Sequence, residues 1–101
     1  MATILVVEHD FGTRIRMTEL LRAGGYDVRG VVDTVAAIEG LGPHLPSAVV
    51  LSLQSDGVST QNLCIAIRQA VFTVPVVVLG PDIDVTTKVT LFEVGADEYI
   101  V

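Results

Sequence analysis

Residues Pro46-Ser47-Ala48-Val49-Val50-Leu51-Ser52-Leu53 are the stretch that decides the fold. The run 48–51 is apolar without a break, which is typical of a strand that is covered on both faces. In an open parallel sheet, ligands and chemistry collect beyond the carboxyl ends of the strands. The function of the protein is therefore expected to depend mainly on the residue at position 52 and on the loop 54–57 that follows it.

Strand-like and helix-like segments alternate on both sides of this stretch. Apolar runs predict buried strands at 4–7 and 73–79, and segments 26–32 and 97–101 predict two more, the first near a sheet edge because it carries charge. Helical periodicity predicts helices over 13–23, from 33 or 34 to 41, from 59 or 60 to 71, and from 82 or 84 to 93. The last is the weakest, because it is rich in β-branched residues. Short connections between alternating elements predict an α/β domain with a parallel sheet.

The composition excludes several classes of function. The chain has 101 residues, 50% of them hydrophobic, and a net charge of −6 from six basic and twelve acidic side chains. That balance argues against binding of nucleic acid through phosphates and against an anionic membrane surface. The apolar runs are too short to span a bilayer, and no basic region precedes the first of them as in a signal peptide. A cytoplasmic protein is the expectation.

Isolated reactive residues give weak signals. Cys64 lies in an apolar stretch without a CxxC or histidine partner, so a buried thiol is expected. His9 stands between Glu8 and Asp10, but adjacent residues rarely converge on one metal ion. His44 is expected in a surface loop. A nucleophile–base pair of Ser52 and His9 lacks an evident third group, so hydrolase chemistry is not favoured.

The order and spacing of these segments resemble the CheY-like receiver domains of bacterial response regulators. The resemblance rests on Ile4-Leu5-Val6-Val7-Glu8, the strand after Pro46, Val74-Pro75-Val76-Val77-Val78-Leu79 and Gly95-Ala96-Asp97-Glu98-Tyr99. It implies a flavodoxin-like, doubly wound sheet of five parallel strands in the order 2-1-3-4-5. Residues 1–101 then form one receiver-like domain, expected to be the N-terminal part of a longer protein.

The resemblance also shows where this chain departs from the family. Receivers transfer a phosphoryl group to an aspartate with the help of Mg²⁺. Glu8 fills the first acidic position, but His9 stands at the metal-binding acid, Ser52 at the phosphoacceptor and Gly80 at the Thr or Ser position. The family lysine falls after Val101. Because Mg²⁺ prefers carboxylate and other hard oxygen ligands, its binding is expected to be weak or lost, with Glu8 and Asp10 the only weak candidates.

Geometry adds an expectation about one face of the sheet. Right-handed crossovers in this strand order place the first helix on one face and the next three on the other. Five strands make a sheet roughly 20 Å wide and a helix covers about 10 Å, so helix 13–23 leaves about half of its face bare. In the family a fifth helix covers the rest. The chain is therefore expected either to continue beyond Val101 or to pair with a second copy.

These observations lead to one main hypothesis and two alternatives. The main one is a non-enzymatic pseudo-receiver that acts by protein–protein contact or self-association in two-component signalling or transcription regulation. By resemblance, its interaction face comprises Val85, Val89, Phe92 and Tyr99. The first alternative is a phosphoryl-accepting receiver with a displaced acceptor, such as Asp56. The second is a flavodoxin-like small-ligand binder, although the loop 10–13 is poor in the residues that favour FMN. No cofactor is expected.

Overall fold

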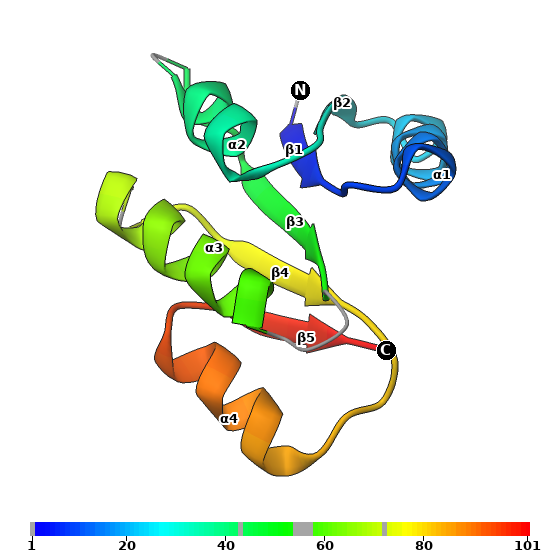
Figure 1. Cartoon of the computed structure of the whole chain (residues 1–101). Helices are drawn as coiled ribbons and strands as arrows, with labels where there is room; N and C mark the ends of the chain where they lie inside the picture. Colours follow the sequence, from blue (N-terminus) through cyan, green and yellow to red (C-terminus); the bar gives the residue numbers. More distant parts are fainter. Residues whose placement is uncertain (1, 43, 54–57, 72) are drawn as a thin grey trace.

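The computed structural model describes residues 2–42, 44–53, 58–71 and 73–101. Five strands and four helices alternate along the chain (Figure 1). They are β1 (Thr3–Val7), α1 (Phe11–Ala23), β2 (Asp27–Val31), α2 (Thr34–Leu41), β3 (Ala48–Ser52), α3 (Val58–Ala70), β4 (Val76–Leu79), α4 (Val85–Glu93) and β5 (Glu98–Ile100). Within the described residues no helix is both long enough and apolar enough to cross a membrane.

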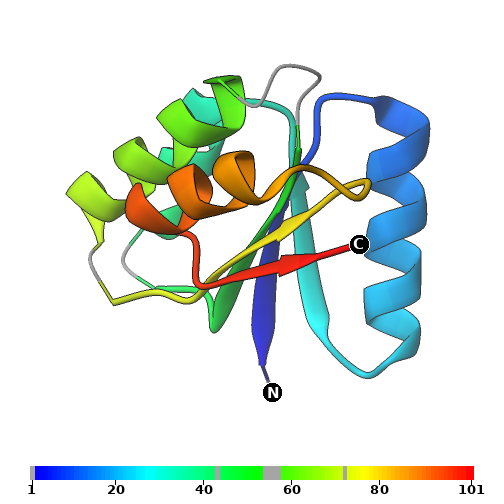
Figure 2. The ribbon, with the colours of Figure 1, turned by 90° about the horizontal axis from the view of Figure 1, so that it is seen from below.

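The strands form one parallel sheet in the order β2-β1-β3-β4-β5, which confirms the predicted topology. Val6 of β1 pairs with Val50 of β3, and Val50 pairs in turn with Val77 of β4. β2 lies at the edge, as its charged residues predicted. The view in Figure 2 shows α1 alone on one face and α2, α3 and α4 on the other, as expected for right-handed crossovers.

The two faces carry cores of unequal size. On the three-helix face, side chains such as Leu51, Ile67 and Leu91 are fully buried. On the α1 face, the buried cluster is limited to Ile4, Val6, Val28 and Val50, with Met17, Leu21, Val77 and Leu79 packed against it while only partly buried. Fewer helices cover this face, so its apolar strand residues are less completely removed from water.

The central strand is shorter than the predicted 46–53. It spans Ala48–Ser52, so that Pro46 and Leu53 both lie outside it. Proline has no N–H to give to a ladder, which suits Pro46 to the approach rather than to the strand itself. Leu53 N still donates to Leu79 O at 2.8 Å, so the chain leaves the sheet only after this contact.

Aspartates begin three of the helices. α1 starts at Phe11, two residues before the predicted start, because Asp10 accepts a hydrogen bond from Thr13 N at 2.9 Å. Asp33 caps α2 through Ala36 N at 2.8 Å, and Asp84 caps α4 through Thr87 N at 2.9 Å. These side chains satisfy N–H groups that the first turn of a helix leaves without a partner. α4 forms in spite of its β-branched residues, with this cap at its start and Leu91 fully buried.

The packing of α1 differs from its simple amphipathic pattern. Leu20 is 75% exposed, whereas Thr18 is buried with its hydroxyl donating to Ile15 O at 2.9 Å. α1 approaches β2 closely at Gly30, where an added Cβ would lie 3.1 Å from side-chain carbons of Arg14 and Thr18. The close approach places Thr18 against β2, whereas Leu20 lines an apolar pocket with Val50 and Val77 of the sheet.

Arg68 of α3 holds the chain segments before β4 and β5 together. Its guanidinium donates to Gly95 O at 2.9 and 2.7 Å, to Val74 O, and to the Asp97 carboxylate at 2.6 Å. Asp97 accepts a further bond from Val76 N at 2.8 Å. No local sequence pattern indicated this cluster. Its position at the amino-terminal ends of the strands separates it from the candidate functional site.

Candidate functional site

The carboxyl ends of β1, β3 and β4 meet at one edge of the sheet and form a cavity of about 400 Å³. Glu8, His9, Ser52 and Gly80 all contribute to its wall. The four positions singled out in the sequence are therefore brought together, as the parallel topology predicted. The remaining lining comes from Thr13, Met17, Leu53 and Leu79, none of which the sequence pattern had indicated.

Glu8 is the buried carboxylate of this cavity. The residue is only 4% exposed. Its Oε1 accepts a hydrogen bond from Asp10 N at 3.1 Å, and it lies 3.6 Å from His9 Nδ1, which is beyond hydrogen-bond distance. Its Oε2 is buried and has no hydrogen-bond partner in the described part of the chain. This carboxylate oxygen has lost its hydrogen bonds to water without gaining others from the described residues, which costs free energy.

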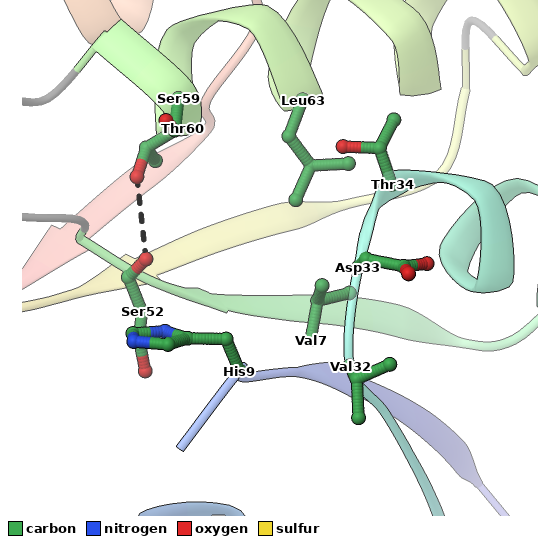
Figure 3. A pocket seen from close by; sticks show the side chains of 9 residues that line it. All are labelled: Val7, His9, Val32, Asp33, Thr34, Ser52, Ser59, Thr60 and Leu63. Carbon is green, nitrogen blue, oxygen red and sulfur yellow. Dashed lines mark hydrogen bonds between the residues drawn. The ribbon is translucent and has the colours of Figure 1, made fainter.

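Ser52 ends β3 and is half-buried. Its hydroxyl lies 3.6 Å from Met17 Sδ, and its backbone carbonyl accepts a hydrogen bond from Thr60 Oγ1 at 3.2 Å (Figure 3). Thr60 is itself buried, so this bond attaches the first turn of α3 to the end of the central strand. A hydroxyl at this position does not supply the charge of an aspartate.

A second cavity, of about 200 Å³, lies on the other side of Ser52. His9, Ser52, Asp33 and Thr34 all line it, and Figure 3 shows Asp33 and Thr34 at the side away from Ser52. His9 is largely exposed, and the Asp33 carboxylate is engaged in capping α2. A nucleophile–base–orienter arrangement needs a third group that holds the imidazole. The nearest carboxylate, Glu8, is too distant from Nδ1 to hydrogen-bond.

The residues present do not fit a Mg²⁺ ion. Mg²⁺ requires octahedral coordination by hard oxygen ligands, with carboxylates supplying the charge. Among the described residues that line the cavity, Glu8 alone carries a carboxylate, while His9 presents an imidazole and Ser52 a neutral hydroxyl. Asp10 caps α1, and the Thr13 N–H and then the Thr13 hydroxyl lower the pKa of Asp10 below 3.8. Among the described residues no three His, Cys, Asp or Glu side chains form a metal-binding group.

Because residue 80 is a glycine, the Tyr99 hydroxyl lies in the space that a side chain at this position would occupy. A Cβ at residue 80 would lie 2.5 Å from Tyr99 Oη and 2.8 Å from Leu53 Cβ. The Tyr99 hydroxyl donates to Pro81 O, which attaches β5 to the loop after β4. Partial burial, and then the Asp82 carboxylate, raises the pKa of Tyr99 above 10.0. The space where the family has a Thr or Ser side chain is therefore filled by a tyrosine from the neighbouring strand.

The residues of the expected interaction face lie around α4 and β5. Val85, Val89 and Phe92 of α4 are 74%, 45% and 44% exposed. Tyr99 is half-buried, and Lys88 Nζ lies 5.7 Å from the centroid of its ring. Three of the four side chains are thus accessible to a partner. His44 is exposed and Cys64 is buried, as predicted, and burial raises the pKa of the Cys64 thiol to about 11. Asp56 lies outside the described residues.

Comparison with known proteins places these features in a family. No family model matches the chain. Over 98 residues it is 31% identical to the transcriptional regulatory protein PrrA of Mycobacterium tuberculosis, and over 97 residues it is 33% identical to the DNA-binding response regulator MtrA of Mycobacterium leprae. These alignments cover 97% and 96% of this chain, but the chain spans only 42% and 43% of those two relatives.

Solved structures give the same result. A putative response regulator from Chloroflexus aurantiacus is 33% identical with a TM-score of 0.80, and the match covers 97% of this chain and 82% of that one. The chemotaxis protein CheY4 of Vibrio cholerae has a TM-score of 0.89 at 19% identity, over 100% and 86% of the two chains, and supports the fold alone. With the sheet order and this similarity taken together, the chain belongs to the receiver domains of response regulators, which act in two-component signalling.

Proposed function

We propose that this chain is a phosphorylation-independent pseudo-receiver, which signals by protein–protein contact and does not accept a phosphoryl group. The observation that carries the proposal is the hydroxyl of Ser52 at the end of β3, in a cavity where Glu8 is the one carboxylate among the lining residues that the structure describes. An acyl phosphate needs a carboxylate acceptor, and a serine hydroxyl is a poor nucleophile without an activating base.

The surroundings of Ser52 support the same proposal. Phosphoryl transfer depends on positioning and on electrostatic stabilisation of the transferred group. His9 replaces an oxygen ligand with imidazole, and Gly80 offers no hydroxyl. Tyr99 occupies the space beside Gly80. The described lining of the cavity therefore supplies neither the charge for a divalent cation nor a hydroxyl at residue 80 for a phosphoryl oxygen.

Signalling without phosphorylation then depends on surfaces that are permanently available. We propose that α4 and β5 form one such surface, with Val85, Val89 and Phe92 exposed and Tyr99 at its border. PrrA and MtrA are named as transcriptional or DNA-binding regulators. By analogy, the whole protein that contains this domain is proposed to act in transcription regulation through an output domain.

The test is phosphorylation by a small-molecule donor. The protein is incubated with acetyl phosphate and Mg²⁺, and its intact mass is measured without acidic or alkaline treatment. An unchanged mass is expected. A gain of one phosphoryl group would overturn the proposal, and parallel reactions of Asp56→Asn and Ser52→Ala would then identify the acceptor. Loss of the gain in Asp56→Asn would establish the alternative of a receiver with a displaced acceptor.

A further inference from the structure

β2 forms one edge of the sheet, at the opposite end of the strand order from β5. Asp27 N donates to Ala2 O at 3.0 Å, so the backbone groups of Asp27 face β1. Because these groups point alternately to the two sides of a strand, those of Val28 and Gly30 point away from the sheet. The outer side of β2 therefore presents backbone donors and acceptors that β1 does not use.

The edge is open at Gly30. One outward carbonyl, Val28 O, accepts a hydrogen bond from Arg22 at 2.9 Å. The outward N–H and C=O of Gly30, by contrast, have no hydrogen-bond partner in the described part of the chain, and Gly30 is exposed. A Cβ on Gly30 would meet Arg14 and Thr18, so α1 covers the face of the strand here and not its edge. An added strand can reach these backbone groups from the side.

Two guanidinium groups flank this edge, one on each face of the sheet. Arg22 reaches it from α1, whereas Arg29 lies on the face of α2 and donates to Gly40 O at 3.3 Å. Both acceptors are neutral carbonyls, and within the described residues neither arginine forms an ion pair with a carboxylate. Two positive charges without a counter-charge thus lie beside the edge of a chain whose net charge is −6.

Apolar side chains lie beside the same edge. Phe11 and Ile15 are eleven and seven residues before Arg22, spacings that place all three on one side of α1. Phe11 is 68% exposed and Ile15 is 39% exposed. The stem of Arg14, in the same turn as these two residues, lies where a Cβ of Gly30 would be. The edge is therefore basic near Val28 and apolar near Gly30.

We propose that β2 is a docking edge that takes up an extended, acidic segment of a partner protein as a sixth strand. The backbone of the segment pairs with the outward groups of Val28 and Gly30. Its carboxylates bind Arg22 and Arg29, and an aliphatic side chain packs beside Ile15. The inference goes beyond the proposed function, because it uses neither Ser52 nor the α4 surface and does not depend on whether the domain accepts a phosphoryl group.

Charge favours this occupant over others. Neighbouring residues of a strand point to opposite faces, so two adjacent acidic residues place one carboxylate beside each guanidinium. Guanidinium and carboxylate groups form strong, charge-assisted hydrogen bonds. A basic segment would add like charge at this edge. A second copy of the chain would bring its own Arg22 and Arg29 there, so that like charges would meet again.

The first experiment measures binding of short peptides with blocked ends by calorimetry at low salt. One peptide has an Asp-Glu pair followed by alternating valine or isoleucine and threonine, and its twin has Asn-Gln in place of the acidic pair. The reversed sequences are included, because an edge strand accepts both directions. In one direction the acidic peptide should bind about tenfold more tightly than its twin. Equal affinities, or no binding in either direction, would overturn the proposal.

The second experiment tests whether the peptide binds as a strand. N-methylation of the peptide amides that face β2 should abolish binding, whereas N-methylation of the alternate amides should change the affinity by about twofold or less. Hydrogen exchange of Gly30 N–H should slow by about tenfold or more at saturation. Binding that survives the first modification, or an exchange rate of Gly30 that does not change, would refute the added strand.

Two matched variants locate the acidic pair. Arg29→Gln should remove most of the preference for the acidic peptide. Arg16→Gln removes the same charge from an exposed position that lines a different pocket of α1, with Glu19 and Leu20, and should change the preference by about twofold or less. Equal losses in the two variants would show a general effect of charge and refute the site.

A second copy at the edge gives a different result. Sedimentation equilibrium of the protein alone should show a monomer at the concentrations used for hydrogen exchange. A dimer in which Gly30 N–H is already protected would assign the edge to self-association and overturn the proposal. The acetyl phosphate reaction tests the proposed function separately, and its outcome does not change the result expected for these peptides.

Discussion

We expect any side chain at residue 80 to destabilise the protein, because the space around Gly80 is already filled. In Gly80→Ala the new Cβ lies 2.8 Å from Leu53 Cβ and 2.5 Å from Tyr99 Oη. Both distances are shorter than side-chain carbons tolerate. The Tyr99 hydroxyl lies at the end of a side chain that can rotate away. Leu53 Cβ is bonded directly to the backbone and can shift less. The substitution therefore overpacks the site and strains the Tyr99–Pro81 hydrogen bond.

The magnitude follows from this overpacking. Such substitutions cost about 1–3 kcal/mol, which is a large part of the roughly 5–15 kcal/mol that stabilises a domain. In a domain of this size each kcal/mol lowers Tm by about 4–8 °C. Gly80→Thr, which introduces the kind of residue that the family has here, should destabilise the protein at least as much as Gly80→Ala. Adding Tyr99→Phe to Gly80→Ala should restore part of the loss, because it removes the closest contact.

The assay is urea unfolding followed by far-UV circular dichroism for all variants, and Tyr99 fluorescence is read in a Tyr26→Phe background for those that keep Tyr99, where it is the one remaining tyrosine. Gly12→Ala is the matched control. Its Cβ meets only Asp10 Oδ2, at an ordinary 3.6 Å, and residue 12 lies within α1, where alanine is favoured. If Gly80→Ala were as stable as Gly12→Ala with unchanged Tyr99 fluorescence, the reasoning about this position would be refuted.

Three further predictions concern the rest of the domain. Arg68→Lys should lose about 1.5–3 kcal/mol of unfolding free energy, because one ammonium group cannot satisfy Gly95 O, Val74 O and the Asp97 carboxylate together; an unchanged urea midpoint would contradict this. Cys64, with its pKa raised to about 11, should react slowly with iodoacetamide at pH 8 in the native protein and rapidly in urea, and equal rates would show that it is not buried. Hydrogen bonds from Thr13 and Thr87 lower the pKa values of Asp10 and Asp84, so their stabilisation is present above the unfolded pKa and is lost as pH falls below about 4. In the double variant Asp10→Asn/Asp84→Asn, the free energy of unfolding should therefore fall less steeply as pH is lowered below about 4. The same slope as in the wild type would show that these two caps do not cause the loss of stability in acid.

The sequence predicted the architecture because its signals were local and repeated. Unbroken apolar runs identified the buried strands, and Asp33 and Asp84, each one of two candidate caps in the sequence, are the N-caps of α2 and α4. It also predicted which positions meet at the cavity, since parallel strands end at a common edge. Boundaries were less accurate. Leu53 falls outside β3 although it is apolar, because strand ends depend on pairing partners and not on hydrophobicity.

The features that the sequence did not predict all depend on tertiary contacts. Met17 and Leu79 line the cavity together only because α1 crosses the sheet where it does. Arg68 reaches Asp97 across 29 positions of sequence, and no local pattern encodes that distance. The unpartnered oxygen of Glu8 likewise appears only when its surroundings are folded. Single-residue roles of this kind require the three-dimensional structure.

The most direct test of the central claim is a Mg²⁺ titration of the wild type beside a variant in which His9→Asp and Ser52→Asp restore the two acidic positions. Amide NMR shifts at residues 8, 52 and 80 report binding in both proteins. The account predicts no saturable shift in the wild type at millimolar Mg²⁺ and a clear one in the double variant. Saturable Mg²⁺ binding by the wild type in that range would contradict it.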